Sequence, residues 1–301
     1  HGQSQRSSQI DQQKESPDQK KDLVINSMIL IMLFFILALF YIKNISLTTS
    51  DIGRHLQNGF QFLHRGTVFF TNSYSYPEIN YPTITHHWGA GVVYYGVYKL
   101  LGFTGLVFFN AFTCVMGIML AMISSIKKSG FQKTLIVCVT LLPLLAFRTE
   151  VRPESFSFLF IALFYLIFEK IKNNKILVPL LLLLQILWVN THIFFIFGPF
   201  ICGLYYLEEL QKKSWNFKKS SKFYLVFSLL LLFISSINPY GITGVLTPFM
   251  ILKKYGFMVA ENQSILFMIK RTNDPLYLTS LIVIIISFVL GLNYSRQYKN
   301  N

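Results

Sequence analysis

Charged residues are scarce in this chain of 301 residues, and acidic residues are the scarcest of them. Only 13% of the residues are charged, against about a quarter in a typical soluble domain, whereas 53% are hydrophobic. This balance excludes an ordinary water-soluble domain and indicates a membrane protein.

Cysteine is also rare, with three residues at Cys114, Cys138 and Cys202. All three fall inside apolar runs, and their spacing is not that of a set of metal ligands. The sequence therefore gives no sign of a disulfide framework or a zinc site, and it predicts three inert core residues.

The shortage of acids leaves 13 Asp and Glu against 27 Lys and Arg, a formal net charge of +14. A nucleic-acid partner is not indicated, because the basic residues are scattered between apolar runs instead of forming one stripe. Membrane orientation explains them better, since cytoplasmic loops are enriched in Lys and Arg.

Long uncharged runs are what the chain has in abundance, at residues 23–42, 103–126, 176–207 and 276–292. A helix needs about 20 apolar residues to cross a bilayer. The pattern predicts an all-α polytopic membrane protein with about eight transmembrane helices. These helices are expected to begin near Leu23, Phe103, Thr134, Ser155, Ile176, Ile193, Phe223 and Leu276.

The short basic loops all lie on one side if the N-terminus is cytoplasmic. The run at 176–207 must then be a hairpin that turns at "WVNTH", residues 188–192, because a single crossing would place the next lysine-rich loop outside. We expect an inner-membrane protein with both termini cytoplasmic, a disordered tail at 1–22 and one transmembrane domain at 23–301. The missing initiator Met suggests a trimmed or partial chain.

Several predicted crossings are short, at residues 134–147, 155–168 and 176–189. About 14 residues give roughly 21 Å of helix against a hydrocarbon core of about 30 Å. One interpretation is that snorkelling lysines absorb the mismatch. The other is a recessed polar cavity that opens outward, where ionisable groups at membrane depth form a functional site.

The outer side is expected to receive residues 48–102 and 238–275 and the turns "RTEVRPES" and "WVNTH". In the first segment, apolar residues at Ile52, Leu56, Phe60 and Leu63 predict a helix that lies along the interface. A second interfacial helix is expected near "HHWGAGVVYYGVYKLLG".

Asp51 lies where the first predicted crossing leaves the bilayer. Three interpretations stay open: it caps the interfacial helix beside Ser50, it acts as a general base, or it binds a metal ion. Arg54 and His55 stand three and four positions later, and they are expected to contact either lipid headgroups or the phosphate of a lipid donor.

The turn "RTEVRPES" places two arginines and two acids together. These charges either neutralise one another or leave Arg152 to bind a lipid phosphate, with Glu154 capping the next helix or orienting the arginine. Asn190 and His192 in "WVNTH" are either structural or contact substrate. Glu261, in the last outer segment, is either a solvated acid or part of the site.

The order of these motifs resembles the GT-C superfamily of integral membrane glycosyltransferases, which includes the protein O-mannosyltransferases and lipid A aminoarabinose transferases. The likeness rests on "SDIGRHLQNG", "NSYSYP", "HHWGAGVVYYGVYKLLG", "RPESFSFLF", "LWVNTHIFF" and "NPYG", and it runs from about Leu23 to Glu261. It is closer to bacterial membrane proteins of that superfamily.

The resemblance implies transfer of a sugar from a polyprenyl-phosphate donor to a glycan, lipid or protein acceptor on the extracytoplasmic face, with Asp51 as catalytic base. It also places His86 and His87 where relatives shape the active site. By topology and motif likeness, Arg152, Arg54 and His55 would bind the donor phosphate. Further substrate contacts would come from Glu154, Asn190, His192 and Glu261.

Two features depart from the superfamily pattern. The chain ends after about eight predicted crossings, so the acceptor-binding part is absent, supplied by a partner, or lost to truncation. No acid pair stands at Asp51, since Ser50 and Ile52 flank it, and a divalent metal is therefore possible but not favoured as a cofactor.

Two rival functions stay open at the level of sequence. A transporter or flippase of an anionic lipid or lipid-linked sugar would use the same arginines as a path, although internal repeats and midplane helix breaks are not evident. A non-catalytic subunit that binds lipid-linked sugar would tolerate the loss of Asp51.

Overall fold

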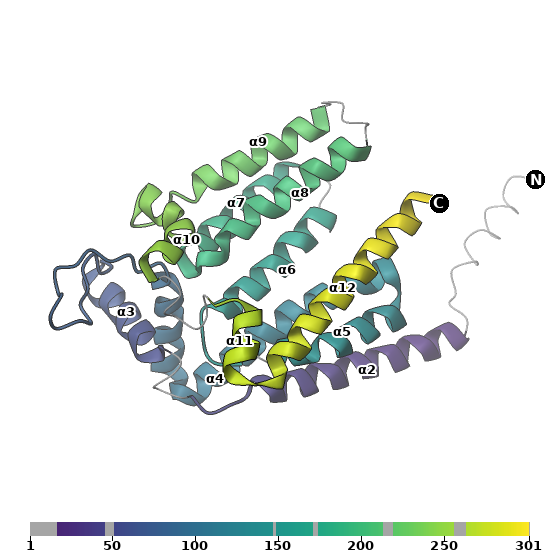
Figure 1. Cartoon of the computed structure of the whole chain (residues 1–301), viewed down its shortest axis with the longest axis horizontal. Helices are drawn as coiled ribbons and strands as arrows, with labels where there is room; N and C mark the ends of the chain where they lie inside the picture. The colour runs from purple at the N-terminus through teal and green to yellow at the C-terminus, as the bar shows by residue number, and fades with distance from the viewer. Residues whose placement is uncertain are drawn as a thin grey trace, which may run out of the picture.

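The chain folds into helices, and the computed structural model describes residues 17–45, 51–146, 149–170, 174–212, 219–255 and 263–300 (Figure 1). Within these ranges the only β pairing is an isolated bridge between Thr71 and Pro82. The predicted all-α class is confirmed for the described residues.

Eleven α-helices and one short 3₁₀ helix make up the described fold. In chain order they are α2 (Pro17–Tyr41), α3 (Ile52–Arg65), α4 (Trp88–Ser129), α5 (Phe131–Ala146), α6 (Glu154–Lys170), α7 (Asn174–Thr191), η2 (Ile193–Ile196), α8 (Phe197–Lys212), α9 (Lys219–Ile234), α10 (Gly241–Tyr255), α11 (Ile265–Thr272) and α12 (Pro275–Asn300).

In the part of the chain that the structure describes, three helical stretches are long and apolar enough to cross a membrane: Lys20–Tyr41, Trp88–Ser129 and Ile193–Gln211. Shorter apolar helices accompany them, at Phe131–Leu142, Lys175–Thr191, Lys222–Ile234, Gly241–Met250 and Pro275–Leu290. Large apolar side chains point outward on α2 and α12; Leu39 is 71% exposed and Phe288 is 66% exposed. This surface is compatible with a membrane protein.

The run at residues 176–207 is interrupted where a turn was predicted, because α7 ends at Thr191 and η2 begins at Ile193. The predicted start of the first helix is less accurate. Helix α2 begins at Pro17 and so includes the last part of the segment predicted as a disordered tail, since Pro is well suited to the first turn of a helix. Residues 1–16 lie outside the described ranges.

Helix α4 joins the second predicted interfacial helix to the crossing that follows it. The 42 residues would extend roughly 60 Å, about twice the hydrocarbon thickness. The two parts meet at a kink at Gly102, whose φ of 67° and ψ of −164° are open to glycine and strained for other residues. The kink therefore marks where the helix changes direction.

Helix α3 packs closely on the first part of α4 through two glycines. A Cβ added at Gly59 would lie 2.6 Å from the carbonyl carbon of Gly91 and 2.7 Å from Cβ of Tyr95. A Cβ at Gly91 would lie 2.6 Å from the carbonyl oxygen of His55. Only residues without a side chain allow this approach, and it fixes α3 and Asp51 at one end of the bundle.

The core beneath this end is aromatic and aliphatic. Its fully buried members include Tyr94 on α4, Phe164 on α6, and Leu181 and Trp188 on α7. A second cluster fills the space between α2, α4 and α5, with Leu37 and Val115 at its centre. In Figure 1, α3, α10 and α11 lie toward one end of the molecule, whereas the C-terminal end of α12 lies toward the other.

Candidate functional site

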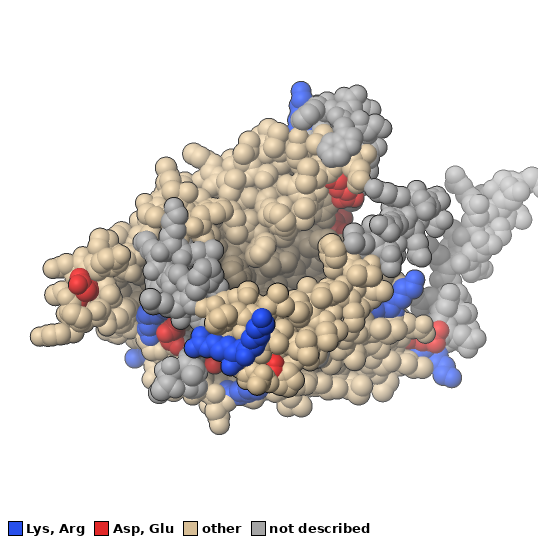
Figure 2. All heavy atoms as spheres, viewed as in Figure 1, with Lys and Arg blue, Asp and Glu red and all other residues tan. Residues whose placement is uncertain are grey.

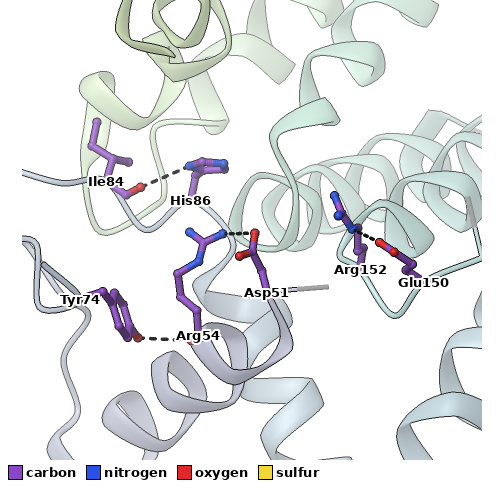
Figure 3. A network of polar contacts seen from close by, with 7 residues as sticks. All are labelled: Asp51, Arg54, Tyr74, Ile84, His86, Glu150 and Arg152. Atoms are coloured by element: carbon purple, nitrogen blue, oxygen red, sulfur yellow. Dashed lines mark hydrogen bonds and ion pairs between the residues drawn. The ribbon is translucent and has the colours of Figure 1, made fainter. Parts of the chain in front are cut away.

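Asp51 begins the site, directly before α3. Its backbone is left-handed, with φ of 53° and ψ of 12°, a conformation that Asp and Asn tolerate better than other non-glycine residues. Its side chain makes no capping hydrogen bond, so the helix-cap interpretation is not what the structure shows. Instead Arg54 Nη2 donates to Asp51 Oδ2 at 2.9 Å, and the Asp51 side chain is 62% exposed (Figure 3).

Four histidines form a contiguous group beside this ion pair. The ring centroids of His86 and His87 are 4.0 Å apart, those of His87 and His192 are 5.1 Å apart and nearly parallel, and those of His55 and His87 are 5.6 Å apart. His55 is 2% exposed and His192 is 3% exposed. We call His55, His86, His87 and His192 the histidine cluster.

The histidine cluster is electrically neutral at pH 7, because burial disfavours the charged imidazolium. Burial lowers the pKa of His55 to about 3 and that of His192 to about 3. Burial also lowers the pKa of His86 to about 4 and puts that of His87 well below its usual range. The cluster therefore presents neutral rings that can both donate and accept hydrogen bonds.

The charged residues of the site lie within electrostatic range of His55. After burial, Arg54 lowers the pKa of His55, Asp51 opposes it, and His86 and Arg152 lower it further. The structure thus brings together Asp51 and Arg54 from the start of α3 and Arg152 from the turn before α6 (Figure 3).

Arg152 lies in the turn "RTEVRPES", as predicted, and its Nε donates to Glu150 Oε2 at 2.7 Å. The predicted neutralisation between charges of this turn is therefore present for this pair. Glu154 is the first residue of α6. A small pocket of about 10 Å³, close to the size of one water molecule, is lined by Cys114, Glu150, Arg152, Glu154, Ser155 and Phe158.

His192 and Asn190, predicted as substrate contacts, have partners within the protein. Trp188 Nε1 donates to Ser157 Oγ at 2.8 Å, and the Ser157 hydroxyl lies 2.7 Å from His192 Nδ1. Phe194 N also donates to His192 Nδ1 at 3.4 Å, so Nδ1 is an acceptor, the serine hydroxyl donates to it, and the proton of the neutral His192 ring is on Nε2. Asn190 Oδ1 accepts from Trp88 Nε1 at 2.9 Å, and its Nδ2 donates to Ile186 O and Ile237 O. Asn190 therefore joins segments of the fold.

Two tyrosines that were not among the predicted site residues fix the segment between α3 and α4 by hydrogen bonds. Tyr240 donates to Phe69 O at 2.6 Å and accepts from Thr85 N at 3.0 Å, so it ties both ends of that segment to the "NPYG" turn. Tyr74 lies 2.5 Å from Asn58 Oδ1 on α3. The stretches "NPYG" and "NSYSYP", which contain Tyr240 and Tyr74, indicated turns. No local pattern identified the distant residues that these tyrosines bind.

The remaining predicted site residue, Glu261, lies outside the described residues. Within the described ranges, no group of three His, Cys, Asp or Glu side chains is arranged to hold a metal ion. A metal site that combines Asp51, a histidine and Glu261 is not tested by this finding.

Figure 2 shows a hollow on the face that α12 borders, with walls that are mostly neither basic nor acidic and with acidic side chains at its upper right edge. Basic and acidic side chains gather below the hollow, near α11 and toward the end that carries α3. Helix α11 contributes Lys270 and Arg271 in its last turn. This face thus combines a hollow that holds few charged side chains with a group of charges at one end.

Comparison with protein-family models, with curated proteins and with solved structures finds no match for this chain. The site is therefore interpreted from its own residues.

Proposed function

We propose that the protein is a membrane glycosyltransferase that moves a sugar from a polyprenyl-phosphate-linked donor to an acceptor on the extracytoplasmic face, with Asp51 as the catalytic base. The observation that carries this proposal is an exposed carboxylate, held in a left-handed backbone conformation, next to Arg54 and within electrostatic range of the neutral histidine cluster. Non-glycine residues in this conformation are uncommon and gather at functional sites.

The reaction needs one base and a stabilised leaving group. Asp51 takes the proton of an acceptor hydroxyl, whose oxygen attacks the anomeric carbon of the sugar. The bond from that carbon to the phosphate oxygen breaks, and the electron pair leaves with the polyprenyl phosphate. A single displacement from the opposite face inverts the anomeric configuration.

Arginines near the carboxylate suit the departing phosphate. Arg54 and Arg152 are each held by an acid, Asp51 and Glu150, through pairs that are partly exposed. Exposed ion pairs contribute about 0–1 kcal/mol, so exchanging a carboxylate for a phosphate partner costs little. Exchange at Arg54 also releases Asp51 for its role as base. Prepositioned cations then stabilise the charge that develops on the phosphate.

The membrane arrangement in this proposal has eight crossings in an inner membrane. They are α2, α4 after its kink, α5, α6, α7, α8 with η2, α9 and α12, and α3 with the first part of α4 lies along the outer interface. Support comes from the apolar character of these helices and from the amphipathic sequence of α3. Both termini are then cytoplasmic, in agreement with the lysine-rich loops.

The test is release of polyprenyl phosphate, detected by mass spectrometry, when purified protein is incubated with polyprenyl-phosphate sugars and a membrane extract as acceptor. Wild type should release the lipid, and Asp51→Asn should lower the rate at least a hundredfold because the base is lost. Glu78→Gln is the matched control, since Glu78 is another exposed acid near the same end.

Two results would overturn the proposal. Equal release by wild type and Asp51→Asn removes Asp51 from the chemistry. Binding of the donor lipid by wild type without any release supports the alternative functions, a transporter or flippase of an anionic lipid, or a subunit that binds lipid-linked sugar without acting on it.

A further inference from the structure

Two nitrogen atoms of the histidine cluster are buried without a hydrogen-bond partner. These are Nδ1 of His55 and Nε2 of His87. A buried polar atom without a partner costs about 1–3 kcal/mol, so native proteins rarely leave one without water or a ligand. Two such atoms on neighbouring rings, 5.6 Å apart between centroids, therefore require an explanation.

Packing alone does not supply the missing partners. His55 contacts His87 and Tyr94 edge to face, with ring centroids 5.6 and 6.1 Å apart, which satisfies the faces of the rings but not these nitrogens. An aromatic residue such as Phe would fill the same space without the cost of a buried nitrogen. The histidines thus offer hydrogen bonds that the fold does not use.

The chemistry of the cluster selects a kind of ligand. A neutral imidazole has one donor and one acceptor, which matches a hydroxyl group, because a hydroxyl also donates and accepts. A carboxylate or an ammonium group would bury a charge against neutral rings, which is far more costly than burying a hydroxyl. A polyol without formal charge fits the cluster best.

We infer that His55 and His87 form the subsite for the hydroxyl groups of the transferred sugar, and that this sugar is uncharged. The inference rests on the proposed function and deepens it by naming the class of sugar. The division of roles follows from position: the arginines receive the phosphate, Asp51 receives the acceptor proton, and the neutral rings receive the sugar.

Both nitrogens are covered in this structure, so the sugar must displace some of what covers them. The Asp51–Arg54 pair lies at the start of the same helix as His55, and its side chains are 62% and 42% exposed. This pair is the cheapest part of the site to rearrange.

The test compares dissociation constants in lipid nanodiscs for bare polyprenyl phosphate and for the same lipid carrying a neutral hexose, a uronic acid or an aminosugar. Wild type should bind the neutral hexose lipid about 25-fold more tightly than the bare lipid, since each of the two hydrogen bonds contributes about fivefold. His55→Phe and His87→Phe should each lose about fivefold of this preference, taken as the ratio of the dissociation constants of bare lipid and hexose lipid for the same variant.

His64→Phe is the matched control, because His64 is exposed on the same helix as His55 and its Nδ1 already pairs with Phe60 O. It should keep the full preference for the neutral hexose lipid. If a variant does not fold, the comparison of the four lipids with wild type decides the question alone.

The outcomes separate this inference from the proposed function. Equal binding of hexose lipid and bare lipid, or tighter binding of a charged sugar, overturns the subsite even if polyprenyl phosphate is released. An unchanged preference in both Phe variants does the same, and means that the two nitrogens serve buried water only. A preference that the variants abolish, without any release of polyprenyl phosphate, retains the sugar subsite and overturns the transferase.

Discussion

At the scale of single residues, Asp51 combines an unusual backbone conformation, which affects stability, with a carboxylate, which is proposed to act in the reaction. Asp51 and Asn273 are the two non-glycine residues with positive φ in the described part of the chain, at 53° and 52°. Both residue types tolerate this conformation because their short polar side chains interact locally, whereas a Cβ in other residues clashes with the following carbonyl oxygen.

The first prediction compares substitutions at Asp51 and at Asn273, because the two residues share the same backbone conformation. Ala at either position should lower the free energy of unfolding by about 1 kcal/mol, whereas Asp51→Asn should change it by less than about 0.5 kcal/mol. Thermal unfolding in detergent measures these differences. A large loss of stability in Asp51→Asn would mean that the carboxylate is needed for the fold.

The second prediction concerns pH and the histidine cluster. An unfolded histidine has a pKa of about 6.5, whereas burial lowers the pKa of His55 to about 3 and that of His86 to about 4. Below pH 6.5 the unfolded state binds more protons than the folded state, so stability should fall as the pH falls from 7 to 5. Each histidine contributes up to about 1.4 kcal/mol per pH unit.

Unfolding of wild type, His55→Phe and His64→Phe at pH 7 and pH 5 measures this dependence. His55→Phe should reduce the loss of stability between pH 7 and pH 5, because one buried imidazole is removed. His64→Phe, at an exposed position, should show the same loss as wild type. Stability that is constant or rises between pH 7 and pH 5 would show that the cluster is not buried as neutral rings.

At the scale of elements, the packing of α3 against α4 determines where Asp51 lies. The third prediction compares two glycines of α3. Gly59→Ala should cost at least about 2 kcal/mol, because its Cβ would meet the backbone of Gly91. Gly53→Ala should stabilise by roughly 0.5–1 kcal/mol, since nothing lies within 4 Å of its added Cβ and Ala favours helix. Denaturation in detergent distinguishes them, and equal effects would contradict the close approach of α3 and α4.

Helices and their ends could be predicted from the sequence where local patterns determine them. Charge balance between the loops predicted a break within residues 176–207, and α7 ends there at Thr191. Apolar spacing predicted helix α3, because that pattern depends only on neighbours in the chain. The role of Asn190 could not be found in this way. Its amide bonds Trp88 Nε1, which is 102 positions away, and Ile237 O, which is 47 positions away. Such pairs depend on how helices pack.

The site was predictable to a similar degree. The composition of the outer turns selected the histidines and Arg152, and the structure brings them near Asp51. The partners could not be predicted, however, since Ser157 belongs to an apolar run that reads as a crossing, and the predicted turn that begins at Trp188 does not show which residue its indole contacts. Polar side chains inside such runs are recognised only when a neighbouring helix supplies their partner.

At the scale of the whole molecule, the orientation in the membrane is the fourth prediction. Tyr76, which is 97% exposed, should be extracytoplasmic, and Lys127 in the last turn of α4 should be cytoplasmic. In intact cells, Tyr76→Cys should react with a membrane-impermeant maleimide, and Lys127→Cys should react only after permeabilisation. The native cysteines are buried and give a low background. The reverse labelling pattern would contradict the proposed topology.

The central claim is that Asp51 performs chemistry on a lipid-linked sugar. The most direct measurement is the rate of polyprenyl phosphate release by Asp51→Asn and by Asn273→Ala, at matched amounts of folded protein. We expect Asp51→Asn to keep its stability and lose release, whereas Asn273→Ala should be less stable and still release the lipid. Release by Asp51→Asn at the wild-type rate would show that Asp51 is not the base.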